Sequence, residues 1–368
     1  MGLGESIAVL GAGNGGYAMA GDLASRGLPV AFYEHPSFAE GFAETLSTGG
    51  VVLEGALGTR SSRVHLATTD IGEVMETSSL LNLVVPSTAQ ETFFRAMMAH
   101  LRDGHTVVVW AGRFGSLRLL HLLKESGIQR DITVVEANTL PYGVRRSGPN
   151  VARVLYTSLR LYLAPVPRSN TGKVIEEIGA LYEGAQASDS LLAAAFSNPA
   201  LVVFGIGALL NVARIQHTKG KFYLFGEGIT EGVADVMEAA YREMEEVGRA
   251  LGFSIPGYTR EEFRGPASIE GVNFTSPGGV EDFAKMDGPS TVRGRYMMEN
   301  IGDGIVPIAQ LARRVDVACP VLDAVITLGS IVCQDDFLNK GRNLNRLGMG
   351  EANPAEIRRV STEGFWAR

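Results

Sequence analysis

Residues 7–34 read IAVLGAGNGGYAMAGDLASRGLPVAFYE, and this stretch decides the fold of the N-terminal half. An apolar run, Ile7–Leu10, leads directly into the glycine-rich segment 11–16. A helical pattern follows and stops at Gly27, and a second apolar run ends in the acidic Glu34. A strand, a glycine turn, a helix, a strand and an acid in this order are typical of a dinucleotide-binding unit.

Each glycine of this motif has a predicted role at the cofactor. Gly11 permits the tight turn, Gly13 lets the backbone approach a pyrophosphate, and Gly16 lets the helix pack closely on the strand. The first turn of the helix then offers unpaired N–H groups and a partial positive charge to the phosphates. The predicted cofactor contacts in the motif are Gly11, Gly13, Asn14, Gly15 and Gly16.

The acid at the end of the second strand indicates which cofactor binds. Glu34 is expected to accept hydrogen bonds from the adenosine ribose hydroxyls, and its carboxylate would repel a 2′-phosphate. No arginine occurs among the next three residues, which begin with His35. We therefore expect NAD, with NADP as the alternative, because a protonated His35 or the more distant Arg60 could reach a phosphate.

Composition narrows the class of protein. The 368 residues suffice for two domains, and 45% hydrophobic against 20% charged residues indicate a globular chain. A net charge of −7 without a dense basic run argues against nucleic acid as a partner. Cys319 and Cys333 are the only cysteines, no Cys/His cluster has metal-ligand spacing, and we expect no metal site. Without a signal peptide or a run of about 18 apolar residues, we expect a cytoplasmic protein that spans no membrane.

Alternating strand and helix patterns continue to about residue 185. Buried strands are predicted at 80–85, 106–110 and 132–137, with helices at 88–101 and 116–126 between them. This alternation predicts a parallel, doubly wound sheet of the Rossmann type. Further strand-like segments lie at 51–54, 63–67 and 151–165.

Ligands bind beyond the carboxyl ends of the strands in such sheets. Pro86 and Ser87, Gly112, and Asn138 follow three of the predicted strands. We therefore expect these residues to line one crevice together with the glycine motif and Glu34.

The second half of the chain has a mostly helical pattern. Residues 190–210 form a long apolar helical pattern, 232–251 an amphipathic one and 320–333 another apolar one, whereas 254–292 reads as loops. We predict a dinucleotide-binding domain over residues 1–187 and a helical substrate and dimerisation domain over 188–368. The apolar faces of 190–210 and 320–333 are expected to pair in a homodimer.

A nucleotide-binding domain followed by a helical domain resembles the opine dehydrogenases, which include the octopine and nopaline enzymes. These reduce the imine formed between a 2-oxo acid and an amino acid. The segments that carry the resemblance are EANTLPY at 136–142, LLN at 209–211, FGEGIT at 225–230, RYMMEN at 295–300, GIVP at 304–307, GRNL at 341–344 and LG at 347–348.

The resemblance fails at two positions. Family members carry a histidine near the start of the helical domain, which exchanges a proton during hydride transfer, and an aspartate that orients it. Here the histidine position falls on Phe204 and the aspartate position on Asn300. The only histidine of the second half, His217, lies in a turn and is expected to be solvated. Loss of both partners together is coherent, because an aspartate left alone would be a costly buried charge.

This loss suggests the chemistry. Hydride addition to a ketone develops an alkoxide and needs a proton donor, whereas an iminium acceptor already carries positive charge. We hypothesise that the protein reduces a preformed C=N substrate that bears a carboxylate, with Phe204 placing an aromatic face near the cation or packing in the core. Condensation of a 2-oxo acid with an amino acid, with another donor such as Tyr142, is one alternative. A non-catalytic dinucleotide-binding sensor is the other.

Three further residues are candidates for substrate binding. Arg295 matches the arginine of the family motif, and its planar fork suits a carboxylate, although a structural salt bridge would also explain it. Asn198 and Asn211 lie in the apolar helical pattern, where a buried amide needs partners. One of them is expected to face the nicotinamide or the substrate, with helix-packing hydrogen bonds as the alternative. Glu299 could supply a proton if it were desolvated, but it is expected to be exposed.

Overall fold

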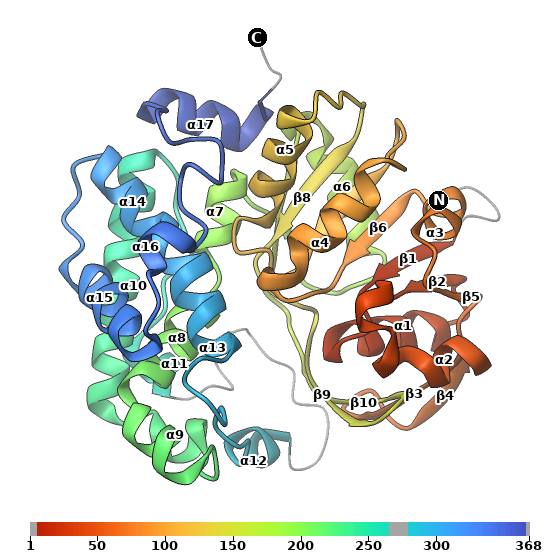
Figure 1. The fold of residues 1–368 in the computed structure, drawn as a ribbon, viewed down its shortest axis with the longest axis horizontal. Helices are drawn as coiled ribbons and strands as arrows, with labels where there is room; N and C mark the ends of the chain where they lie inside the picture. Colours follow the sequence, from red (N-terminus) through yellow and green to blue (C-terminus); the bar gives the residue numbers. More distant parts are fainter. Residues whose placement is uncertain (1–5, 265–278, 366–368) are drawn as a thin grey trace.

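The computed structural model describes residues 6–264 and 279–365, which form a sheet-containing part and a helical part side by side (Figure 1). The main sheet has eight strands in the order β12-β11-β8-β7-β6-β1-β2-β5. These strands are β1 (Ile7–Leu10), β2 (Val30–Tyr33), β5 (Leu66–Thr68), β6 (Leu80–Leu83), β7 (Thr106–Val109), β8 (Thr133–Ala137), β11 (Leu161–Val166) and β12 (Ala185–Ala187).

The central strands are buried on both faces, which explains their uninterrupted apolar sequences. Every residue of β1, β2, β6 and β7 is buried, as expected for parallel strands covered by helices. The chain leaves β1 for β2 on one side and later places β6 on the other side of β1. This reversal creates the crevice in which doubly wound sheets bind ligands. The prediction of a doubly wound sheet followed by a helical domain is confirmed.

A second sheet of four strands, in the order β4-β3-β10-β9, is a feature that the sequence patterns missed (Figure 1). Its strands are β3 (Gly50–Gly55), β4 (Arg60–Arg63), β9 (Tyr142–Gly148) and β10 (Val151–Thr157). The predicted strands 63–67 and 151–165 are therefore wrong as single strands, because each is divided between the two sheets. The main sheet is also not wholly parallel, since β11 runs antiparallel to β8. Such pairings connect distant segments, so local patterns do not reveal them.

Helices cover the main sheet and build the second part. Those of the first part are α1 (Asn14–Ser25), η1 (Pro36–Phe42), α2 (Ala43–Thr48), α3 (Ile71–Thr77), α4 (Ser87–Met98), α5 (Gly115–Glu125), η2 (Arg168–Asn170) and α6 (Thr171–Gly179). The later helices are α7 (Leu191–Phe196), α8 (Ala200–Leu210), α9 (Val212–Thr218), η3 (Leu224–Gly228), α10 (Glu231–Leu251), α11 (Arg260–Arg264), α12 (Gly279–Ala284), α13 (Arg295–Met297), η4 (Met298–Ile305), α14 (Val306–Arg314), α15 (Pro320–Cys333), α16 (Phe337–Lys340) and α17 (Pro354–Glu363).

The apolar stretch 190–210 differs from its prediction in two respects. It is two helices, α7 and α8, because the chain turns at Ser197–Pro199, where proline lacks an N–H and its ring restricts the residue before it. By length and composition Leu191–Leu210 could cross a membrane, contrary to our expectation that no such stretch exists. However, 89% of its most apolar window is buried inside the protein, so it is part of the core.

Two further expectations concern the second part. The predicted loop region 254–292 contains two short helices, α11 and α12, and its residues 265–278 lie outside the described residues. The last strand, β12, ends at Ala187 and α7 begins at Leu191. We keep the domain boundary between residues 187 and 188 as a proposal.

Candidate functional site

A cavity of about 340 Å³ lies between the two parts, at the carboxyl ends of the central strands. It is lined by the glycine motif, by the residues that follow β6, β7 and β8, by the second sheet and by α8. The lining residues are Gly13, Asn14, Gly15, Val84, Val85, Pro86, Trp110, Ala111, Arg113, Thr139, Leu140, Tyr142, Gly143, Val144, Arg145, Leu155, Tyr156, Asn198, Ala200, Phe204, Phe283, Met286 and Arg295.

The glycine motif has the backbone geometry that a dinucleotide needs. Gly11 adopts a φ of +106°, which L side chains rarely adopt, and a Cβ on Gly16 would overlap the Gly11 carbonyl oxygen. A Cβ on Gly13 would meet nothing within 4 Å, so the backbone at this position borders open space. Because Gly13, Asn14 and Gly15 line the cavity where α1 begins, this end fits a pyrophosphate.

Glu34 is buried and holds the glycine loop in place. Its carboxylate accepts 2.7 Å hydrogen bonds from the backbone N–H groups of Ala12 and His35. Burial raises the pKa of Glu34, whereas these two hydrogen bonds and the nearby Arg146 lower it. Arg146 comes from the unpredicted strand β9, lies 4.3 Å from the centroid of the Tyr17 ring, and donates to the Ala12 carbonyl. A cation that the sequence patterns did not indicate therefore stands near the predicted ribose site.

Of the four residues predicted at the ends of β6, β7 and β8, only Pro86 lines the cavity. The Ser87 hydroxyl is 2.7 Å from Asp303 Oδ2. The Gly112 carbonyl accepts from Gln90, and a Cβ on Gly112 would collide with the Glu136 carboxylate. The Asn138 amide bonds to the carbonyls of residues 160 and 197 and to the Tyr162 N–H. Ser87, Gly112 and Asn138 thus shape the turns, and their neighbours form the wall.

Arg113 is the most informative residue that sequence reasoning missed. It lies in the turn after β7, in which Ala111, Arg113 and Phe114 all have positive φ angles, a rare conformation for residues with side chains. The buried Glu136 holds this turn, since its carboxylate accepts hydrogen bonds from the Phe114 N–H and from the backbone and hydroxyl of Ser116. The sequence predicts a cofactor contact in this turn only at Gly112, because no local pattern indicates the direction of the Arg113 side chain.

The two positions of the missing catalytic pair lie on adjacent helices. A Cβ on Gly205 of α8 would be 3.3 Å from the Asn300 Cβ of η4, so the helices are in close contact. Phe204 lines the cavity and packs on Tyr296, with ring centroids 4.8 Å apart. The Asn300 Oδ1 accepts hydrogen bonds from Arg113 Nε at 3.2 Å and Nη2 at 3.1 Å. A guanidinium from the sheet-containing part thus stands beside Asn300, which is itself buried behind the cavity wall.

Glu299 is buried, with 1% of its surface exposed, so the expectation that it is exposed is wrong. Its carboxylate lies 3.5 Å from Arg113 Nη1 and 3.4 Å from Arg295 Nε. Both Arg113 and Arg295 line the cavity, and the Arg295 side chain is 57% exposed. Burial lowers the pKa of Arg113, and the charge of Glu299 opposes this shift. The alternative of a salt bridge for Arg295 is therefore present, and more than half of the side chain stays exposed.

The two candidate asparagines have different surroundings. Asn211 donates to the carbonyls of Gly207 and Gly228 and does not line the cavity, which favours the alternative of helix-packing hydrogen bonds. Asn198, in the turn between α7 and α8, lines the cavity and is 1% exposed. Its Oδ1 accepts from the Ala200 N–H, and its Nδ2 has no partner among the described residues. A buried, unpaired donor at the cavity wall is free to bond to an acceptor inside the cavity.

Tyr142 lines the cavity, but its hydroxyl proton is committed elsewhere. The phenol donates a 2.6 Å hydrogen bond to Asp22 Oδ2 on α1. Burial raises the pKa of Tyr142 well above its usual value, and the Asp22 carboxylate raises it further. We therefore give Tyr142 a structural role and no proton-donor role.

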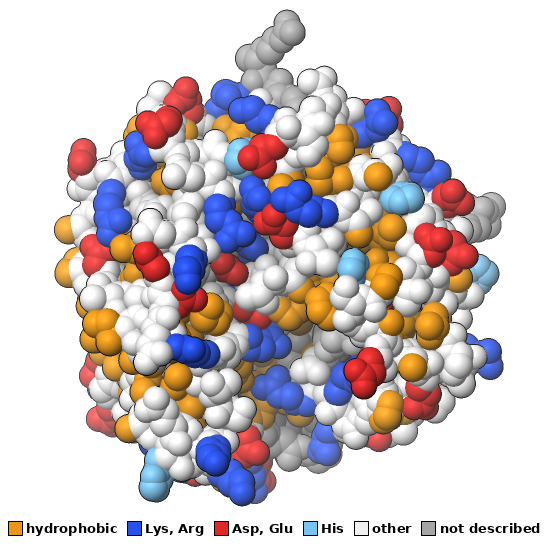
Figure 2. Space-filling model, in the orientation of Figure 1, with side chains coloured by type: hydrophobic (Ala, Val, Ile, Leu, Met, Phe, Trp, Pro, Cys, Tyr) orange, Lys and Arg blue, Asp and Glu red, His pale blue; other side chains and the backbone are white. Residues whose placement is uncertain are grey.

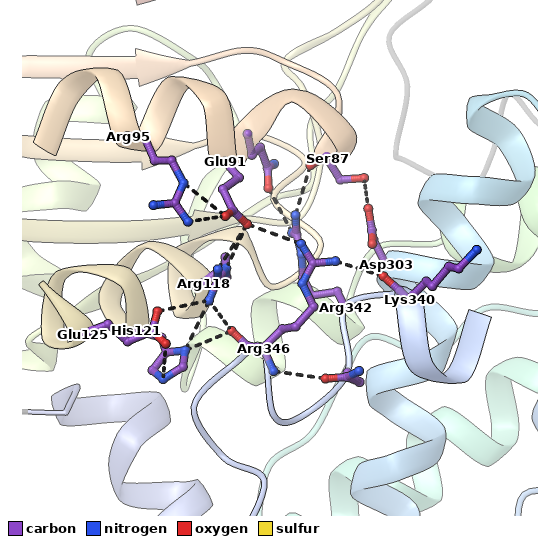
Figure 3. A network of polar contacts seen from close by, with 12 residues as sticks. Ser87, Glu91, Arg95, Arg118, His121, Glu125, Asp303, Lys340, Arg342 and Arg346 are labelled. Carbon is purple, nitrogen blue, oxygen red and sulfur yellow. Dashed lines mark hydrogen bonds and ion pairs between the residues drawn. The ribbon is translucent and has the colours of Figure 1, made fainter. Parts of the chain in front are cut away.

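Arg342 joins the helical part to the turns beside the cavity (Figure 3). Its buried guanidinium donates to the carbonyls of Ser87, Gly112 and Arg113 and to Gln90 Oε1, at 2.7–3.1 Å. Around it, Glu91 of α4 pairs with three more arginines, which are Arg95, Arg118 and Arg346. These contacts fix the turn that carries Arg113 against the helical part.

The cavity is positively charged. Its lining contains the guanidinium groups of Arg113, Arg145 and Arg295, and none of the described lining residues is Asp, Glu or His. Figure 2 shows basic side chains gathered around the hollow between the two parts. Among the described residues no group of acids, histidines and cysteines could hold a metal ion. The lining fits an anionic organic ligand beside a dinucleotide.

Comparisons with known proteins identify relatives of both parts of the chain. A family model described as the NAD/NADP octopine/nopaline dehydrogenase alpha-helical domain matches residues 187–333. A second one, described as the NAD-dependent glycerol-3-phosphate dehydrogenase N-terminus, matches residues 6–158.

The opine dehydrogenase of Arthrobacter sp. (strain 1C) is 28% identical over 360 residues, which cover 96% of this chain and 98% of the relative. The vitopine synthase of Allorhizobium ampelinum is 25% identical over 359 residues, with the same coverage. A solved structure of octopine dehydrogenase with NADH and L-arginine has a TM-score of 0.72 and 19% identity over 99% of each chain, and it shares the fold.

Proposed function

Because this chain belongs to the opine dehydrogenase family of NAD(P)H-dependent oxidoreductases, we propose that it reduces the C=N bond of a substrate that bears a carboxylate. Phe204 and Asn300 stand where relatives are expected to carry the histidine and the aspartate. The proposal includes a preformed imine, cyclic or conjugated, as the substrate. Membership of this family favours an enzyme over the alternative of a non-catalytic dinucleotide-binding sensor.

One observation carries the proposal: Asn300 is bonded to a guanidinium instead of an imidazole. Arginine keeps its proton at all ordinary pH values, so Arg113 cannot act as an acid near neutral pH. No described residue of the cavity lining is a histidine or a carboxylic acid, and the Tyr142 proton is held by Asp22. An acceptor that already carries its proton suits this site better than a ketone.

The proposed step balances without a protein acid. A reduced nicotinamide would supply a hydride when bound in the cleft. The carbon of the protonated imine accepts it, and the C=N electron pair moves to the nitrogen, whose positive charge is lost. The nitrogen keeps the proton with which it arrived, and the product is a neutral amine. Phe204 contributes an aromatic face to the cavity wall, where a cationic nitrogen is stabilised.

Glu34 supports NAD as the cofactor, with NADP as the alternative. Its carboxylate oxygens accept one backbone hydrogen bond each and keep lone pairs for ribose hydroxyls. Arg146 near Glu34 is the group that would favour a 2′-phosphate. The unpaired Asn198 Nδ2 fits an acceptor on the nicotinamide or on the substrate.

Reductive condensation of a 2-oxo acid with an amino acid is the second candidate. The names of the relatives favour it, since they include an opine dehydrogenase and a vitopine synthase. The three arginines that line the cavity, Arg113, Arg145 and Arg295, would suit the two carboxylates of such an imine. In this case the imine forms before or upon binding, and the hydride step is the one described above.

A substrate comparison separates the two candidates. Purified protein with NADH is offered 1-pyrroline-2-carboxylate, a stable cyclic imine, or pyruvate together with each of a set of L-amino acids. NADH oxidation is followed at several pH values, with NADPH in parallel. We expect kcat/KM for the cyclic imine to exceed that for the pyruvate mixtures by at least about tenfold. Turnover of the pyruvate mixtures alone would reject the preformed imine.

We also propose a cellular location and an oligomeric state for this protein. Cys319 and Cys333 are buried and form no disulfide, which suits the proposed cytoplasmic location. The proposed homodimer cannot use 190–210, because α7 and most of α8 are buried within the chain. It would use α15, where Leu328 and Ile331 are 50% and 68% exposed.

A further inference from the structure

We propose that Arg113 binds the substrate carboxylate next to the C=N bond and replaces the missing histidine as the cation of the site. This inference rests on the proposed function, and it assigns a role to a residue outside the helical domain, where the sequence had placed the substrate contacts. Four observations support it.

First, the position of the Arg113 side chain is fixed from both parts of the protein. The Arg113 backbone has a φ of +49°. Ala111 and Phe114, on either side of Gly112–Arg113, also have positive φ angles. Glu136 holds the turn from the sheet side, and Arg342 binds the carbonyls of Gly112 and Arg113 from the helical side. Strained backbone that its surroundings enforce in this way is typical of functional sites.

Second, the guanidinium is oriented but not saturated. Nε and Nη2 donate to Asn300 Oδ1, and Nη1 donates to the Ala111 carbonyl at 3.0 Å and lies 3.5 Å from Glu299. Nη2 carries two hydrogens, and the described residues supply an acceptor for one of them. Arg113 lines the cavity although only 8% of its side chain is exposed, and we assign the second hydrogen to the ligand.

Third, Asn300 suits this arrangement better than an aspartate. The neutral amide accepts from Arg113 through its oxygen and donates to the Tyr296 carbonyl at 2.8 Å through its nitrogen. It therefore orients the guanidinium without neutralising it. An aspartate here would form a buried ion pair with Arg113 and compete with a substrate carboxylate for it.

Fourth, the local charges do not cancel. Arg113 and Arg295 share one buried carboxylate, Glu299, and both guanidinium groups line the cavity. A bound carboxylate would balance the second positive charge. Charge-assisted hydrogen bonds to a guanidinium are among the strong ones, and they orient a planar carboxylate. The anchored substrate would then present its C=N carbon to the nicotinamide side of the cleft.

A binding experiment tests this assignment without turnover. Titration calorimetry measures L-proline and pyrrolidine, which differ by the carboxylate, against the protein saturated with NAD. Arg113→Met is expected to weaken L-proline binding by about 30- to 100-fold and to change pyrrolidine binding and NAD affinity by less than threefold. Arg113→Lys should recover part of the loss, and added guanidinium ion should recover part of it in Arg113→Met.

The outcomes separate this inference from the proposed function. Equal losses for L-proline and pyrrolidine in Arg113→Met, or no preference of the unsubstituted protein for L-proline, would overturn the role of Arg113. Failure of 1-pyrroline-2-carboxylate to be reduced, with an Arg113-dependent preference for L-proline intact, would instead reject the preformed cyclic imine as the substrate and keep the anchor.

Discussion

At the scale of single residues, the site depends on which groups can hold or give a proton. The sequence placed Phe204 and Asn300 at the positions of a lost histidine and aspartate, and the structure adds Arg113 beside Asn300. A guanidinium supplies positive charge but does not give up its proton near neutral pH. The chemistry of the site is therefore expected to take its proton from the substrate.

Restoring the pair should change the pH dependence. In the double variant Phe204→His/Asn300→Asp, a histidine, whose ordinary pKa is about 6.5, would stand at the cavity next to an aspartate that also pairs with Arg113. Its protonated form can donate, so we expect carbonyl reduction with NADH to appear and to rise as the pH falls through that pKa. The rate of carbonyl reduction by the unsubstituted protein should show no such rise at low pH. Steady-state rates from pH 5 to 9 measure this, and the single variant Asn300→Asp is the control. A double variant without this rise would mean that Phe204 does not mark the histidine position.

At the scale of elements, turns position the chemistry and other elements hold the turns. The break between α7 and α8 brings Asn198 to the cavity, and the strained turn after β7 brings Arg113 there. Arg342, from the segment after α16, binds the turn after β7 through the Arg113 carbonyl and the start of α4 through the Ser87 carbonyl (Figure 3).

Removing this link should destabilise the protein and loosen the turn. Arg342→Met keeps the length of the side chain but leaves buried carbonyl groups without their donor, at a cost of about 3 kcal/mol in the free energy of unfolding. Arg346→Met is the matched control. Arg346 is 45% exposed and pairs with Glu91, so its loss should cost under about 1 kcal/mol. Urea denaturation measures both. Similar costs for the two variants would contradict the role of Arg342.

At the scale of the whole molecule, the cleft between the two parts unites a cofactor end and a substrate end. The glycine motif lines one end, and Arg113, Arg295 and Phe204 line the other. The helical part supplies the second wall, so neither part alone contains the site. The proposed homodimer would use the outer surface of the helical part.

The proposed homodimer makes one prediction at this scale. If α15 forms the interface, Leu328→Glu/Ile331→Glu should convert the dimer to a monomer, because both side chains are largely exposed in the single chain. Analytical ultracentrifugation measures the mass in solution. Leu210→Glu, which changes a 45% exposed leucine on α8, is the control and should leave the mass unchanged. A monomeric unsubstituted protein would reject the dimer.

The amino-acid sequence alone determined the parts of this protein that depend on local periodicity and fixed spacing. The glycine motif, the central strands β1, β6, β7 and β8, the helical second half and the family resemblance all follow from neighbouring residues. It also located Phe204, Asn198 and Arg295, which do line the cavity.

Only the tertiary structure decided which distant groups meet. The second sheet pairs residues about 100 positions apart, and Arg113 meets Asn300 across 187 positions. It also showed that Glu299 is buried, that Asn211 bonds within the helical part and that Tyr142 is held by Asp22. Side-chain direction, burial and hydrogen-bond partners depend on long-range packing, which no local pattern encodes.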